Sequence, residues 1–133
     1  MRRLLPTETE DQIALIEWFD LWAPADLRGR LAAIPNGGWR HPKTAAVLKA
    51  TGVRPGFPDL VLLTPRGGYA GLMVELKRVR GSKTSTAQKD WLCWLYAQGF
   101  AVAICPGFES ARDCIKHYLC LDMSSPTIPF CFI

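Results

Sequence analysis

The sequence has neither a long apolar run nor a paired cysteine motif, and each absence excludes a class of protein. No run approaches the roughly 20 apolar residues of a membrane-spanning helix. The basic start at Arg2 and Arg3 lacks the apolar core of a signal peptide, so we expect a cytoplasmic protein. The 5 cysteines form no CxxC pair and have no companion histidine at zinc spacing. They are expected to be small buried hydrophobic residues in a reducing compartment, with no structural zinc.

Acidic residues are scarce in the middle of the chain. Between Leu27 and Lys89 there are twelve lysines and arginines but only two acids, Asp59 and Glu75, within an overall net charge of +4. Such a basic stretch suits a polyanionic partner, because neutralisation of phosphates drives nucleic-acid binding. A merely solvated basic surface is the alternative, but it gives no reason for the two acids.

The remaining composition is that of a globular protein. The 133 residues are 49% apolar and 21% charged, enough for one hydrophobic core, and no linker divides them. We therefore expect a single domain over residues 1–133, with its core at about 7–119 and an apolar tail at 120–133. The tail ends in an uncharged segment, 128–133, that is expected to pack as an edge strand or to lie in a subunit contact.

Capping residues and hydrophobic spacing predict the elements. Thr7 and Glu10 can form a capping box at the start of a helix whose apolar positions continue to Trp22. Ser85 and Gln88 form a second such pair. The other expected elements are an extended run or short strand at 27–34, a helix at 44–50, strands at 59–63, 69–78 and 100–105, and a helix at 110–119. This order predicts a small α/β fold.

Two carboxylates and a lysine form the strongest chemical pattern. Side chains alternate across a strand, so Glu75 and Lys77 share one face while the other face belongs to the core. An isolated ExK is more often an exposed ion pair. Here, however, Asp59 begins a buried strand directly after Pro58, sixteen residues before Glu75.

A PD followed by ExK has the composition of a metal-dependent phosphodiesterase site. Asp59 and Glu75 on adjacent strands can hold Mg²⁺, which prefers oxygen ligands and keeps several waters. A metal ion can lower the pKa of bound water and stabilise charge on phosphoryl oxygens. Lys77 would then orient or activate the water, or neutralise the phosphate.

The order of these blocks resembles the virus-type replication-repair nuclease (VRR-NUC) domain of the PD-(D/E)xK superfamily, from about Thr7 to Leu119. The resemblance implies a restriction-endonuclease-like core with a mixed central sheet flanked by helices. It also implies Mg²⁺ or Mn²⁺ dependence and a homodimeric phage enzyme that cleaves branched DNA such as Holliday junctions. The blocks that carry it are Glu8-Thr9-Glu10-Asp11-Gln12, Ile34-Pro35-Asn36-Gly37-Gly38, residues 52–60, Val74-Glu75-Leu76-Lys77 and Ser85-Thr86-Ala87-Gln88.

The resemblance also implies residue roles. Asp59 and Glu75 correspond to metal ligands, Lys77 to the catalytic lysine, and Gln88 to a further active-site residue. Gln88 also fits a purely structural capping role. Glu8 is our choice for a third metal ligand, because Gln12 shares its helical face. Glu10 is the alternative, unless it caps with Thr7.

Other polar and aromatic residues give weaker signals. The tryptophans on the predicted helices (Trp18, Trp22, Trp91 and Trp94) have the spacing of core or interface residues rather than of base-stacking platforms. The alternatives to a junction nuclease are a flap- or nick-directed nuclease and a catalytically silent DNA-binding domain. The complete Asp59, Glu75 and Lys77 set argues against the silent domain. Candidate DNA contacts are Asn36, Arg40, His41, Lys43, Arg78, Arg80 and Lys83.

Overall fold

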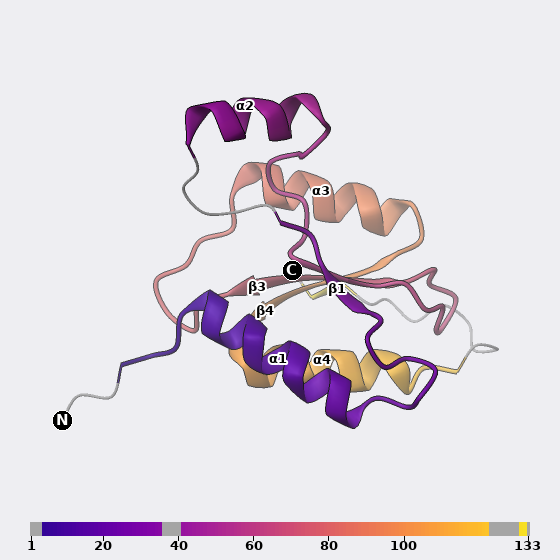
Figure 1. The fold of residues 1–133 in the computed structure, drawn as a ribbon. Helices are drawn as coiled ribbons and strands as arrows, with labels where there is room; N and C mark the ends of the chain where they lie inside the picture. The colour runs from indigo at the N-terminus through magenta and orange to yellow at the C-terminus, as the bar shows by residue number, and fades with distance from the viewer. Residues whose placement is uncertain (1–3, 36–40, 123–130, 133) are drawn as a thin grey trace.

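The computed structural model describes residues 4–35, 41–122 and 131–132, which fold around a central mixed sheet (Figure 1). Within these residues the sheet has the order β1-β2-β3-β4-β5. β1, β2 and β3 pair antiparallel, whereas β4 and β5 continue the sheet parallel to β3. The strands are β1 (Leu31–Ala33), β2 (Leu60–Leu62), β3 (Leu72–Lys77), β4 (Ala101–Pro106) and β5 (Cys131–Phe132). The predicted mixed sheet flanked by helices is confirmed.

Helices cover both faces of this sheet (Figure 1). α1 (Glu8–Trp22) and α4 (Gly107–Leu119) pack against each other on one face, and α3 (Thr86–Ala97) covers the other. α2 (Pro42–Ala50) lies on the α3 side and buries none of its residues. No helix among the described residues is long and apolar enough to cross a membrane.

The alternation along β3 places its side chains in two separate cores. Leu72, Val74 and Leu76 are buried on the α1 and α4 side. Met73, on the opposite face, is buried with Val61 under α3. The second face of β3 is therefore also apolar, and it turns polar only toward the end of the strand, at Glu75 and Lys77.

Both predicted capping boxes are present, but the buried face of α1 differs from the predicted one. The stripe that packs inward is Asp11, Leu15 and Phe19, at i, i+4 and i+8. Ile13 is 55% exposed and Trp22 is 41% exposed, although both belong to the apolar positions whose spacing predicted this helix. Apolar residues occur on several sides of α1, so their spacing in the sequence alone does not determine which side of the helix is buried.

The expectation of buried cysteines is also partly wrong, and of the two roles predicted for the tryptophans, core or interface, the core role does not hold for all of them. Cys105 is buried, but Cys93 and Cys120 are exposed, on α3 and at the end of α4. Trp94, also on α3, is 54% exposed. In the tail, residues 131 and 132 form an edge strand on β4, which is one of the two alternatives predicted for this segment. Asn36 and Arg40 lie outside the described residues.

Candidate active site

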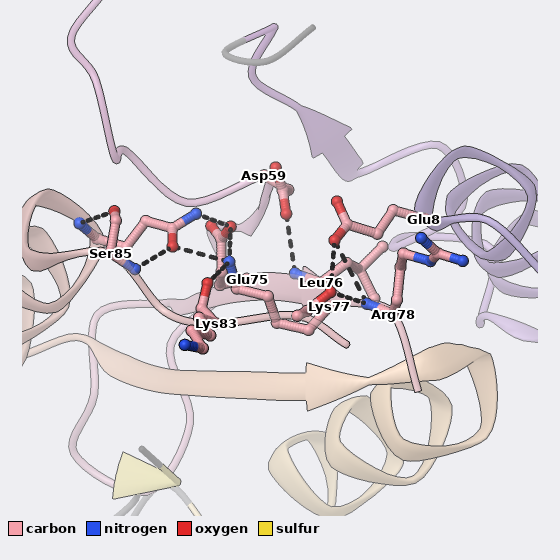
Figure 2. A network of polar contacts seen from close by, with 10 residues as sticks. Glu8, Asp59, Glu75, Leu76, Lys77, Arg78, Lys83 and Ser85 are labelled. Carbon is pink, nitrogen blue, oxygen red and sulfur yellow. Dashed lines mark hydrogen bonds and ion pairs between the residues drawn. The ribbon is translucent and has the colours of Figure 1, made fainter. Parts of the chain in front are cut away.

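The register of β2 and β3 brings the two predicted carboxylates together. Leu60 pairs with Val74 in the antiparallel ladder, so the preceding residue, Asp59, lies beside Glu75 on the α3 face. Asp59 Oδ2 accepts a hydrogen bond of 2.8 Å from the backbone N–H of Leu76 (Figure 2). This bond holds the loop before β2 against β3, and thereby fixes the spacing of the two acids.

Burial and mutual repulsion raise the free energy of ionising the two carboxyl groups. Burial, assisted by the charge of Asp59 and opposed by that of Lys77, raises the pKa of Glu75 to about 8. Burial also raises the pKa of Asp59, against the lowering effect of the Leu76 N–H. Glu75 is only 3% exposed, and its Oε2 has no hydrogen-bond partner among the described residues. A cation bound between the two acids would offset both the burial of their charges and the repulsion between them.

Gln88 links the acid to the lysine. Its Nε2 donates to Glu75 Oε1 at 2.6 Å, and its Oε1 accepts from Lys77 Nζ at 2.8 Å. The same Oε1 accepts from the Ser85 N–H, while Ser85 Oγ accepts from the Gln88 N–H. Gln88 therefore caps α3 and also lies between Glu75 and Lys77, so the two roles that the sequence left as alternatives are compatible in one side chain.

Lys77 is held in place from several directions. Besides its bond to Gln88, its Nζ donates to the carbonyl of Lys83 at 3.1 Å and lies 3.8 Å from Glu75 Oε1 (Figure 2). The side chain is 12% exposed. An ordinary surface lysine keeps most of its rotamer freedom. Lys77 is instead a positioned ammonium group beside two carboxylates.

Gly56 has a structural role that the sequence did not reveal. Its φ is +84°, and a Cβ there would lie 2.5 Å from the carbonyl carbon of Ala87 and 2.7 Å from the Gln88 nitrogen. Only glycine lets the backbone of this loop touch the first turn of α3. The contact sets the loop that carries Asp59 against the helix that carries Gln88.

Glu8 and Glu10, the two candidate acids of the first helix, have different hydrogen-bond partners. Glu10 Oε2 accepts from the Thr7 N–H at 2.7 Å and completes the cap. Glu8 Oε1 instead accepts from the Arg78 N–H at 3.3 Å and from Ser82 Oγ at 3.4 Å, at the end of β3 (Figure 2). Its charge contributes to the raised pKa of Asp59. Glu8 is thus the helix-one acid on the side of the carboxylate pair.

The comparisons with known proteins agree with this geometry. The family model of the VRR-NUC domain matches residues 3–109. The chain belongs to the VRR-NUC family. A solved structure described as a VRR_NUC domain protein is similar, with a TM-score of 0.81 and 26% identity over 95% of this chain and 99% of that one. No curated protein matches the sequence.

Membership of the VRR-NUC family implies a nuclease of the PD-(D/E)xK type, and such nucleases generally use divalent metals. The donors of this chain fit such an ion. Mg²⁺ is commonly bound through one or two carboxylates, with water and substrate phosphate completing its shell. Asp59 and Glu75 supply that set, including the unsatisfied Oε2 of Glu75. The described residues contain no group of three or more acids, histidines or cysteines placed for one ion, so Glu8 does not complete a three-acid site with the pair.

The candidate phosphate contacts of this VRR-NUC domain form two groups. Arg78, Arg80 and Lys83 are exposed in the segment that follows β3, next to the carboxylate pair. His41 and Lys43 are exposed at the start of α2, where His41 Nδ1 accepts from the Lys43 N–H. The first group follows Lys77 directly in the chain, whereas the second group lies on a helix away from the sheet.

Proposed function

We propose that this protein is a metal-dependent, structure-specific DNA endonuclease that cleaves branched DNA such as Holliday junctions. The observation that carries the proposal is the half-buried Asp59 beside the buried Glu75, which Gln88 joins to a positioned Lys77. A pair of acids with raised pKa values beside an immobilised cation is typical of a functional site rather than of a stabilising surface cluster.

Asp59 and Glu75 would hold Mg²⁺ or Mn²⁺, with Glu8 as the candidate third acid. When bound, the ion supplies a water of lowered pKa and stabilises charge on the phosphoryl oxygens. The hydrogen bond from the Leu76 N–H orients Asp59, and the amide of Gln88 orients Glu75. Both ligands are therefore fixed before substrate arrives, which avoids an ordering cost during the reaction.

Lys77 contributes a fixed positive charge on the same face. Hydrolysis forms a bond from a water oxygen to phosphorus and breaks the phosphorus–oxygen ester bond, with a proton lost by the water and one gained by the leaving oxygen. Negative charge grows on the phosphoryl oxygens between these events. The ammonium group, held by Gln88 and the Lys83 carbonyl, can neutralise that charge or orient the water.

The proposed substrate follows from charge and from the family. The cations Arg78, Arg80 and Lys83 are exposed in the segment that directly follows Lys77, and such cations suit phosphate backbones. A four-way junction has two symmetric strands to cut, which a two-fold homodimer would match with two sites. We propose this homodimer as the active form, in the cytoplasm of a host cell if the protein is encoded by a phage.

A panel of labelled DNA substrates tests the proposal. Four-way junction, flap, nicked duplex, linear duplex and single strand are each incubated with Mg²⁺, Mn²⁺ or EDTA. We expect paired nicks in the junction with either metal and none in EDTA. Faster cleavage of the flap or nick would reassign the substrate. Binding without cleavage under every divalent metal would instead make the chain a DNA-binding accessory domain.

A further inference from the structure

A pair of cysteines lies on the face of the sheet opposite to the carboxylate pair. Cys105, on β4, pairs in register with Leu76 of β3 and is buried with it on the α4 side. Cys114 belongs to α4, is partly buried and packs against the same core. The two side chains are hydrogen-bonded to each other, and both are free thiols. The sheet therefore separates these thiols from Asp59 and Glu75.

The two cysteines line a common cleft between β4 and α4. Ser110, Cys114 and His117 follow one stripe of α4 at i, i+4 and i+7, and all three line this cleft together with Cys105. The cleft has a volume of about 380 Å³ and is partly open to solvent. A water molecule occupies about 30 Å³ of liquid, so the cleft has room for small solutes. Such a solute can reach Cys105, although this residue is only 2% exposed.

Hydrogen bonds favour the thiolate form of Cys105. The bond from Cys114, assisted by one from Ser110, lowers the pKa of the Cys105 thiol against the opposing effect of burial. The same bond, together with burial, raises the pKa of Cys114, so the second thiol stays protonated beside the first. This division is typical of a reactive cysteine with a resolving cysteine next to it. Burial in apolar surroundings alone would instead raise the pKa and leave the thiol inert.

The composition of the cleft fits redox chemistry better than metal binding. His117 and Asp113 line it beside the two thiols, and all of these residue types can bind metals. In the part of the chain that the structure describes, however, no three such side chains are placed around one ion. A structural zinc ion takes four protein ligands. Two thiols in contact need only lose their hydrogens to form a disulfide.

We propose that Cys105 and Cys114 are a peroxide-reactive dithiol that closes to a disulfide between β4 and α4. The Cys105 thiolate attacks one oxygen of hydrogen peroxide and the O–O bond breaks. Cys105 becomes a sulfenic acid, and the departing hydroxide takes up the proton released by the thiol to give water. The sulfur of Cys114 then attacks the sulfur of Cys105, and the S–O bond breaks. The second hydroxide leaves as water with the proton of Cys114.

One peroxide is thus reduced to two molecules of water by the two electrons that the thiols lose. Hydrogen peroxide is the fitting oxidant because it is small enough for the cleft, whereas a bulky disulfide would meet the exposed Cys93 and Cys120 first. The site lies outside the candidate active site and does not depend on the proposed nuclease function.

Peptide mapping of the full chain after exposure to hydrogen peroxide tests the proposal. Trypsin cuts after Arg112, between the two cysteines, so the disulfide holds together two peptides that separate again on reduction with dithiothreitol. Cys93 shares a tryptic peptide with Cys105 and is exposed, so Cys93→Ser is the matched control and should keep the linked peptides. Cys114→Ser should lose them and leave on Cys105 a sulfenic acid that dimedone traps.

The wild-type map decides the outcome even if a variant fails to fold. The proposal is wrong if Cys105 and Cys114 stay reduced while Cys93 or Cys120 is oxidised, because the exposed thiols would then be the reactive ones. It is also wrong if the linked peptides form at the same rate in urea, where the cleft is absent. Protection of both thiols from alkylation by added Zn²⁺ would overturn it in favour of a metal site.

Discussion

Replacing Glu75 by glutamine removes a buried titratable carboxyl group while keeping the shape of the side chain. Between pH 4.5 and about 8 the folded protein retains a proton on Glu75 that the unfolded chain has released, because burial and Asp59 raise the pKa of this carboxyl to about 8. The free energy of unfolding of the metal-free wild type therefore falls as the pH rises through this window. Glutamine does not titrate, so the variant escapes this loss. Its amide oxygen can still accept from Gln88 Nε2, as Glu75 Oε1 does.

The magnitude follows from the size of the shift. At 1.36 kcal/mol per pKa unit, a rise from 4.5 to about 8 sets a ceiling of about 5 kcal/mol. That pKa already includes the attraction to Lys77. Local relaxation around the ionised group reduces the ceiling further, and we expect Glu75→Gln to gain about 2 kcal/mol at pH 8 and almost nothing at pH 5.

Urea unfolding in EDTA at the two pH values measures this gain, with Glu17→Gln, an exposed acid of α1, as the control. Mg²⁺ should then stabilise the wild type but not Glu75→Gln, since a ligand stabilises only the state that binds it. A variant that is less stable than the wild type at pH 8 would refute the reasoning.

Three further outcomes are expected. Gly56→Ala should destabilise the protein by more than 2 kcal/mol and slow DNA cleavage, because its Cβ would strike the first turn of α3; Gly52→Ala, with φ of +102° but open space around it, should cost only about 1 kcal/mol. Binding of Mg²⁺ at pH 7 should release close to one proton, because Glu75 has a pKa of about 8; calorimetric heats that are identical in phosphate and Tris would contradict this. Tyr118→Phe should cost about 1–2 kcal/mol in thermal unfolding, because the buried hydroxyl donates to the Thr64 carbonyl at 2.7 Å; an unchanged melting temperature would argue against that bond.

Local chemistry made much of the fold and the centre of the site predictable. Both capping boxes are short-range hydrogen-bond patterns, so the starts of α1 and α3 could be predicted from four residues each. The period of two along β3 placed Glu75 and Lys77 on one face. Asp59 could be assigned to the same site because it follows Pro58 directly and begins a buried strand. A carboxylate at such a position is rarely an ordinary turn residue.

The remaining features depend on contacts between distant segments. The rotation of α1 is set by packing of Leu15 and Phe19, and this turns Asp11 inward to 5% exposure, which its charge alone argues against. The contact of Gly56 with α3 is likewise invisible in a sequence, where glycine is usually a turn residue. The two roles of Gln88 became compatible only when the distance from the start of α3 to β3 was known.

The most direct test of the central claim is the single-turnover rate of cleavage of a labelled four-way junction in Mg²⁺ by Lys77→Ala. The matched control is Lys116→Ala, an exposed lysine of α4 on the opposite face of the sheet. Removal of one preorganised charge from an active site typically costs about 10²–10³ in rate, so Lys77→Ala should fall by at least about a hundredfold, while Lys116→Ala stays within about twofold. Cleavage by folded Lys77→Ala at the wild-type rate would contradict the assignment of this site.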